Sequence, residues 1–114
     1  MHRLKTYIVE DSPVILENLV ATLEEAAPVQ VVGSAGDESA ALGWLLESAH
    51  HCDLIIIDLY LRSGSGLEVL RHTAHAGVRG RRVVLSNYAT PEMREECRML
   101  GADRCSTNRA SSMT

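Results

Sequence analysis

Two apolar runs that each end in acidic residues constrain the fold of this chain most strongly. The run Leu54–Ile57 ends at Asp58. The run Tyr7–Val9 ends at Glu10 and Asp11. A short continuous apolar run is typical of a strand that is covered on both faces of a parallel sheet. Because ligands of such sheets collect beyond the carboxyl ends of the strands, the three acids predict a site for a divalent cation.

Length and charge limit the classes of protein that the chain can represent. Its 114 residues predict one domain, residues 1–114, with a single core. The net charge of −4 argues against direct binding of nucleic acid, which needs clustered lysine and arginine. No apolar run approaches the roughly 20 residues that span a bilayer. The amino-terminal residues 1–5 lead into a strand without a signal-peptide core, so we expect a cytoplasmic protein.

The cysteines indicate neither a disulfide framework nor a zinc site. They are three in number and no two of them have C-x-x-C spacing. We interpret them as reduced thiols, with Cys52 and Cys97 as small packing residues.

Strand and helix patterns alternate along the chain. Predicted strands cover residues 4–10, 29–33, 54–58 and 83–86, with a weak fifth strand after Gly101. Predicted helices begin near residues 11–13, 37, 67 and 90, where capping residues or prolines precede apolar residues at helical spacing. Parallel neighbours need right-handed helical crossovers, so this order predicts a doubly wound five-stranded parallel sheet in a three-layer α/β/α fold.

Several motifs occur together and in a fixed order. They are the acid pair Glu10–Asp11, Asp58 after four aliphatics, Gly66 eight residues beyond that aspartate, Ser86 at the end of the fourth strand, and Leu100–Asp103. Over nearly the whole chain this combination resembles the receiver domains of bacterial two-component response regulators, which have a flavodoxin-like fold. One departure is Arg62, where the family usually has proline.

The resemblance implies a role for each of these residues. Asp58 would be the phosphoacceptor, taking a phosphoryl group from a sensor histidine kinase. Mg²⁺ would be held by Glu10, Asp11, Asp58 and the backbone carbonyl of Tyr60. The Ser86 hydroxyl would bind the phosphoryl group and couple it to the loop after the fourth strand. Such a domain catalyses only its own phosphorylation and dephosphorylation and is otherwise no enzyme.

The carboxyl-terminal segment departs from the family pattern. Cys105 stands where the family has a switching aromatic residue, and Asn108 stands where it has a lysine that reaches the phosphoryl group. Residues 105–114 also lack apolar periodicity, so we expect the fifth helix to be missing or truncated. One hypothesis is a reading-frame shift, because suitable codons for residues 105–109 read in another frame encode Val-Phe-Asp-Lys-Ser. A chain with an uncovered helix face is expected to form homodimers or to aggregate.

Other interpretations remain open at the level of sequence. A degenerate receiver could serve as a phosphorylation-independent interaction module, as Cys105 and Asn108 would allow. A haloacid-dehalogenase-like phosphatase would need a second acid where Tyr60 stands. A flavodoxin relative would need a phosphate-binding loop after the first strand. Asp11 could be only a helix cap, and His50–His51 are best interpreted as solvated loop residues.

Overall fold

A single parallel sheet organises the structure. The computed structural model describes residues 3–47, 50–86 and 90–106. In these residues five parallel strands have the order β2-β1-β3-β4-β5. The strands are β1 (Leu4–Val9), β2 (Val29–Ala35), β3 (Leu54–Asp58), β4 (Arg81–Leu85) and β5 (Arg104–Ser106). The predicted strand order along the chain is confirmed, including the short fifth strand.

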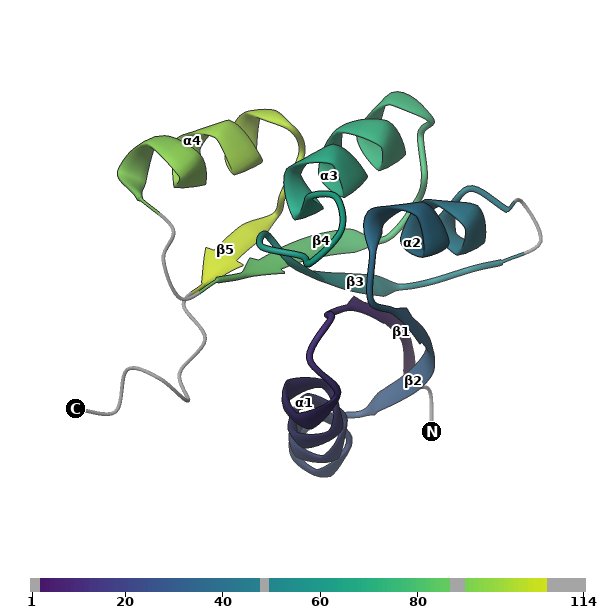
Figure 1. The fold of residues 1–114 in the computed structure, drawn as a ribbon. Helices are drawn as coiled ribbons and strands as arrows, with labels where there is room; N and C mark the ends of the chain where they lie inside the picture. The colour runs from purple at the N-terminus through teal and green to yellow at the C-terminus, as the bar shows by residue number, and fades with distance from the viewer. Residues whose placement is uncertain (1–2, 48–49, 87–89, 107–114) are drawn as a thin grey trace.

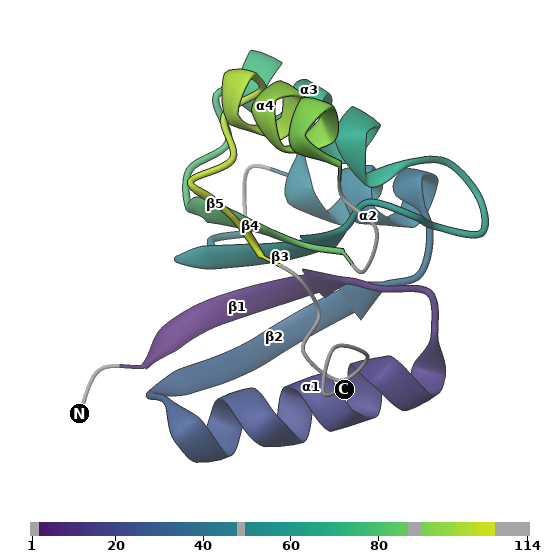
Figure 2. The same cartoon turned by 90° about the vertical axis from the view of Figure 1, so that its left-hand side faces the viewer.

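Four helices cover the two faces of the sheet unequally. They are α1 (Pro13–Ala26), α2 (Glu38–Leu45), α3 (Gly66–His75) and α4 (Pro91–Met99). Helices α2, α3 and α4 lie on one face, and α1 lies on the other (Figures 1 and 2). The described residues contain no fifth helix, as predicted, and residues 107–114 lie outside them. The fold is the expected flavodoxin-like one.

Side-chain caps begin the helices where the sequence indicated. The Ser12 hydroxyl accepts from the backbone N–H of Ile15 at 3.3 Å, and Pro13 occupies the first turn of α1. Asp37 and Thr90 cap α2 and α4 in the same way. Each cap satisfies a backbone donor that the first turn of a helix leaves unpaired. Because Ser12 caps α1, Asp11 is not needed for that structural role.

The core lies mainly between the sheet and helices α2 to α4. Tyr7, Ile55, Ile57 and Val84 from three adjacent strands are almost fully buried there. Cys97 of α4 is also fully buried, and Cys52 is half-buried against the same cluster, which fits the prediction that they are packing residues. All three cysteines are free thiols.

The first and last residues of the strands were predicted less accurately than their central residues. Strand β2 extends two residues beyond the predicted Gly33, because its backbone continues to pair with β1 up to Ala35. Strand β4 begins at Arg81, paired with Leu54 of β3. Ladder hydrogen bonds thus extend strands through residues with no apolar pattern.

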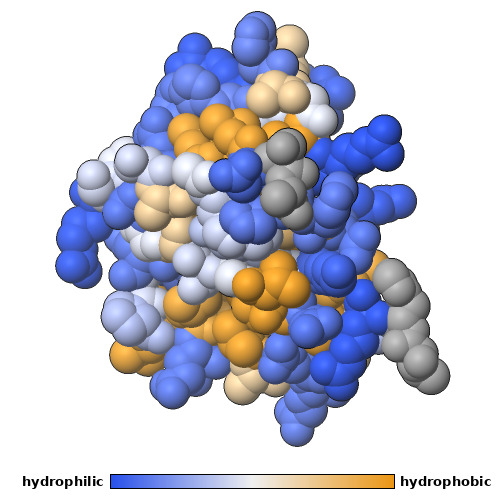
Figure 3. Space-filling view, turned by 90° about the vertical axis from the view of Figure 1, so that its right-hand side faces the viewer, coloured by the Kyte–Doolittle hydropathy of each residue, from blue (hydrophilic) through white to orange (hydrophobic). Residues whose placement is uncertain are grey.

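The surface of the molecule is mixed in character. Figure 3 shows the side that lies on the right in Figure 1, where apolar patches are separated by hydrophilic side chains. The described residues include no helix that is long and apolar enough to cross a membrane.

Candidate metal centre

The three acids identified from the sequence meet at the carboxyl edge of the sheet. Strands β1 and β3 are neighbours, with Val9 opposite Ile57, so the residues that follow Val9 emerge beside Asp58. Glu10, Asp11 and Asp58 each offer a carboxylate oxygen, and these oxygens lie within 4.8 Å of one another. The predicted convergence of the acids is therefore present in the structure.

A backbone N–H orients each of the three carboxylates. The donors belong to the loops that leave β1 and β3: Ser12 donates to Glu10 Oε2 at 3.0 Å, Tyr60 to Asp58 Oδ1 at 3.2 Å, and Arg62 to Asp11 Oδ2 at 2.6 Å. Hydrogen bonds to a carboxylate fix its direction and favour its charged form. The acids are thus oriented by the chain itself, before any cation is bound.

The electrostatics of the cluster favour uptake of positive charge. Glu10 is only 7% exposed, and burial, followed by the charges of Asp58 and Asp11, raises its pKa from 4.5 to about 7. Burial, with the charge of Asp11, also raises the pKa of Asp58. A proton on Glu10 or a cation among the oxygens relieves the same repulsion. Oxygen ligands of this kind suit Mg²⁺, so the donor set fits the predicted cofactor.

The loop between β3 and α3 turns back closely over Asp58. The N–H of Gly66 donates to the carbonyl of Leu59 at 3.0 Å. A Cβ atom on Gly66 would lie 2.2 Å from the carbonyl oxygen of Asp58, which is far inside van der Waals contact. Glycine is therefore required at this position by the close approach of two backbone segments. The constraint explains the glycine eight residues beyond the aspartate.

Ser86 and Tyr60 flank the cluster. Ser86 is 2% exposed and follows Leu85, which pairs with Asp58 across β3 and β4. Its N–H donates to the carbonyl of Ser106 in β5 at 3.0 Å. The Tyr60 ring is half-exposed, and its hydroxyl donates to the sulfur of Met93 in α4 at 3.0 Å. The proposed roles of the Ser86 hydroxyl and the Tyr60 carbonyl stay predictions.

Of the two carboxyl-terminal positions that depart from the family pattern, the structure describes one. Cys105 lies in β5 opposite Val84 and is half-buried against the core. Asn108 lies outside the described residues.

Sequence reasoning missed the contacts that join α2 to the loop after β3. The carboxylate of Glu38 accepts from the N–H of Ser65 at 3.0 Å, and the N–H of Glu38 donates to the carbonyl of Ser63 at 3.2 Å. It also missed that Glu38 lies beside Glu68 and His72 of α3. Only the four-residue spacing of Glu68 and His72, which puts them on one helix face, could have indicated the second contact.

Comparison with known proteins identifies the class. The model of the response regulator receiver domain family matches residues 6–107. The chain belongs to this family, and the resemblance predicted from the motifs is confirmed.

Two characterised relatives share the domain but are longer. The chain is 29% identical over 101 residues to the transcriptional regulatory protein CitB of Klebsiella pneumoniae, covering 89% of this chain and 42% of that protein. It is 32% identical over 96 residues to the cyclic di-GMP phosphodiesterase RocR of Pseudomonas aeruginosa, covering 83% of this chain and 24% of that protein. The chain therefore spans less than half the length of either relative.

Solved structures agree on the fold. The receiver domain of the response regulator NarL from Mycobacterium tuberculosis superposes with a TM-score of 0.84 at 24% identity, over 94% of this chain and 85% of that one. The response regulator domain of Thermotoga maritima CheB also gives 0.84, at 21% identity, over 99% and 84%. The phosphorylated cyanobacterial phytochrome response regulator RcpA gives 0.79 at 25% identity, over 96% and 84%.

Proposed function

We propose that Asp58 is the phosphoacceptor of this receiver domain and that a sensor histidine kinase is the donor. The observation that carries the proposal is the convergence of three carboxylates at one sheet edge, each oriented by its own backbone N–H. Carboxylates held this way are ready both to ligate a cation and to present one oxygen to an incoming phosphoryl group. The reaction would take place in the cytoplasm.

The transfer needs alignment and charge neutralisation more than covalent activation. A carboxylate oxygen of Asp58 forms the new P–O bond while the P–N bond to the donor histidine breaks, and the imidazole leaves with a proton from solvent. Glu10, Asp11, Asp58 and the carbonyl of Tyr60 would hold Mg²⁺, which neutralises charge on the phosphoryl oxygens when bound. Asp58 must be ionised to attack, and its raised pKa makes the cation important for that state.

Ser86 is the residue we assign to sensing the phosphoryl group. It follows the strand residue that pairs with Asp58, and its backbone is bonded to β5. A hydrogen bond from the Ser86 hydroxyl to a phosphoryl oxygen would pull this end of β4 toward Asp58.

Phosphorylation by a small phosphodonor tests the proposal. The metal-free chain is incubated with acetyl phosphate, with and without Mg²⁺, and its intact mass is measured. We expect one added phosphoryl group that requires Mg²⁺, its loss in Asp58→Asn, and its retention in Asp53→Asn at the opposite end of β3. Absence of labelling in the intact protein would favour the degenerate receiver that acts only as an interaction module.

We also infer a homodimer that uses the face of α1. Helix α1 carries apolar residues along one side, and none of its residues is buried. The half-exposed members are Ile15, Leu16, Leu19, Val20 and Leu23. Apolar surface of this kind is covered in most soluble proteins. Sedimentation at several concentrations should reveal association that Leu19→Glu weakens, and a monomer at high concentration would contradict the inference.

A further inference from the structure

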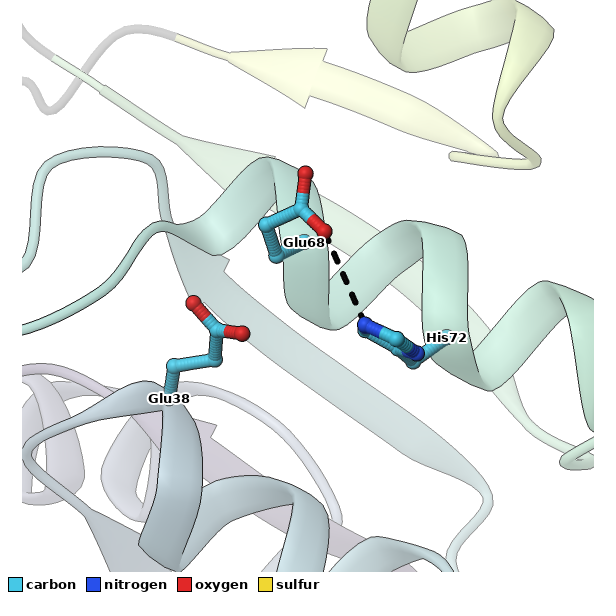
Figure 4. Close-up of side chains that lie close together, drawn as sticks. All are labelled: Glu38, Glu68 and His72. Carbon is cyan, nitrogen blue, oxygen red and sulfur yellow. Dashed lines mark ion pairs between the residues drawn. The ribbon is translucent and has the colours of Figure 1, made fainter.

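A second cluster of metal-ligating side chains lies between α2 and α3, apart from the three acids. It comprises Glu38 at the start of α2 and the pair Glu68 and His72 on α3 (Figure 4). Their ligand atoms lie within 4.8 Å of one another. Glu68 and His72 are four residues apart and project from adjacent turns of one helix. We propose that these three side chains bind a divalent transition-metal ion of the zinc class.

The distance between Glu68 and His72 supports coordination. His72 Nε2 and Glu68 Oε1 are 3.6 Å apart, which exceeds the roughly 2.7–3.2 Å of a hydrogen bond. Two ligands bound to one tetrahedral zinc ion at its usual bond lengths lie about 3.3–3.5 Å apart. The pair is therefore spaced for an ion between its two ligand atoms, and a carboxylate oxygen of Glu38 lies within 4.8 Å of both.

The surroundings hold the two carboxylates in place while leaving the cluster accessible. The N–H of Ser65 donates to Glu38 Oε1 at 3.0 Å. Arg71 pairs with the other oxygen of Glu68, Oε2, so that Oε1 faces the imidazole. Glu38 and Glu68 are half-buried and His72 is exposed, so an ion can enter from solvent. Water would supply the remaining ligand.

The donor set distinguishes this cluster from the acidic site at the sheet edge. An imidazole nitrogen suits zinc, cobalt, nickel and copper, whereas Mg²⁺ prefers oxygen ligands alone. The acidic site offers only oxygens. The two sites should therefore select different metals. Glu38 accepts a hydrogen bond from Ser65, which caps α3. An ion in the second site would therefore link α2 to the loop that follows Asp58.

Cobalt titration tests the proposal. Metal-free protein is titrated with Co²⁺ in saturating Mg²⁺, visible absorption is followed, and Zn²⁺ is then added as competitor. We expect one equivalent of Co²⁺ to bind and to give visible absorption bands with the intensity typical of tetrahedral Co²⁺. Zn²⁺ should displace all of the bound Co²⁺. His72→Ala and Glu38→Gln should each weaken binding at least about ten-fold, because each removes one of three protein ligands. The matched control, His75→Ala, removes an exposed histidine from the same helix and should leave affinity unchanged.

Other outcomes would overturn the proposal. Equal affinity in His72→Ala and His75→Ala would exclude the imidazole as a ligand. Loss of binding in Asp11→Ala, with His72→Ala unaffected, would assign the ion to the acidic site. Thiolate charge-transfer bands in the near ultraviolet would assign it to a cysteine. Absence of cobalt binding would exclude the site altogether. None of these results depends on phosphorylation of Asp58.

Discussion

The backbone N–H of Arg62 donates to Oδ2 of Asp11 at 2.6 Å, which ties the loop after β3 to the end of β1. The contact joins residues that are 51 positions apart in the chain. Arg62 stands where the family usually has proline, and proline has no N–H to donate. In this chain the substituted position therefore orients one of the acids that we propose as metal ligands.

Mg²⁺ should stabilise the fold through the acidic site. A ligand that binds only the folded state at ten times its Kd adds about 1.4 kcal/mol. For a domain of this size that corresponds to a rise in Tm of roughly 4–8 °C. Asp11→Ala should abolish the rise, while Glu25→Gln, an exposed acid on α1, should retain it. Equal melting temperatures with and without millimolar Mg²⁺ in calorimetry would contradict the site.

The pH dependence of stability should report the ionisation of Glu10. Burial, followed by the charges of Asp58 and Asp11, raises its pKa from 4.5 to about 7. A raised pKa in the folded state gives stability that is complete below pH 4.5 and is lost as pH rises through 7. In the absence of metal, the free energy of unfolding of the wild type should fall by about 1–3 kcal/mol more over this pH range than that of Glu10→Gln, because glutamine does not ionise. This range includes a reduction for screening by water near the site.

Urea denaturation of wild type and Glu10→Gln at pH 5 and pH 8 measures the difference. Mg²⁺ affinity of the wild type should rise over the same interval, because the cation displaces the proton. Parallel pH profiles for the two proteins would show that Glu10 does not titrate near neutrality.

Two glycines should respond to the same substitution in opposite ways. In Gly66→Ala the new Cβ would lie 2.2 Å from the Asp58 carbonyl oxygen, so the loop must shift. We expect the free energy of unfolding to fall by about 3 kcal/mol. In Gly43→Ala, within α2, the new Cβ meets nothing within 4 Å and should stabilise the helix by about 0.5–1 kcal/mol. Urea denaturation measures both effects. If the midpoints of the two variants shifted in the same direction, the packing described around Asp58 would be contradicted.

Asn108 should limit the conformational response to phosphorylation. Without a lysine at this position, the phosphoryl group would be neutralised by Mg²⁺ alone and would pull less strongly on Ser86. We expect small NMR shift changes at Ser86 and Thr90 on phosphorylation of the wild type. Asn108→Lys, combined with Cys105→Phe and an added fifth helix, should enlarge them. Large changes already present in the wild type would show that Asn108 is not a defect.

The sequence was sufficient for the parts of the fold that depend on apolar pattern and capping. In the run Leu54–Ile57 the three isoleucines are buried because both faces of β3 are covered, while Leu54 is half-buried, and Asp58 follows the run as predicted. The caps at Ser12, Asp37 and Thr90 are local interactions, so they could be recognised from a few adjacent residues.

Long-range backbone contacts could not be predicted in this way. The bond from Arg62 to Asp11 and the bond from Ser65 to Glu38 use backbone N–H groups, which every residue but proline possesses. Nothing in the side chains identifies these donors. The absence of buried residues in α1 also depends on what packs against the helix, which its apolar spacing does not show.

Locating the phosphoryl group within the chain tests the central claim most directly. Protein phosphorylated by a sensor kinase or by acetyl phosphate is reduced with borohydride, which converts an aspartyl phosphate to homoserine, and its peptides are sequenced by mass spectrometry. We predict homoserine at position 58 alone, and none in protein kept free of Mg²⁺. Homoserine at Asp11, Asp53 or another acid, with Asp58 intact, would contradict the account.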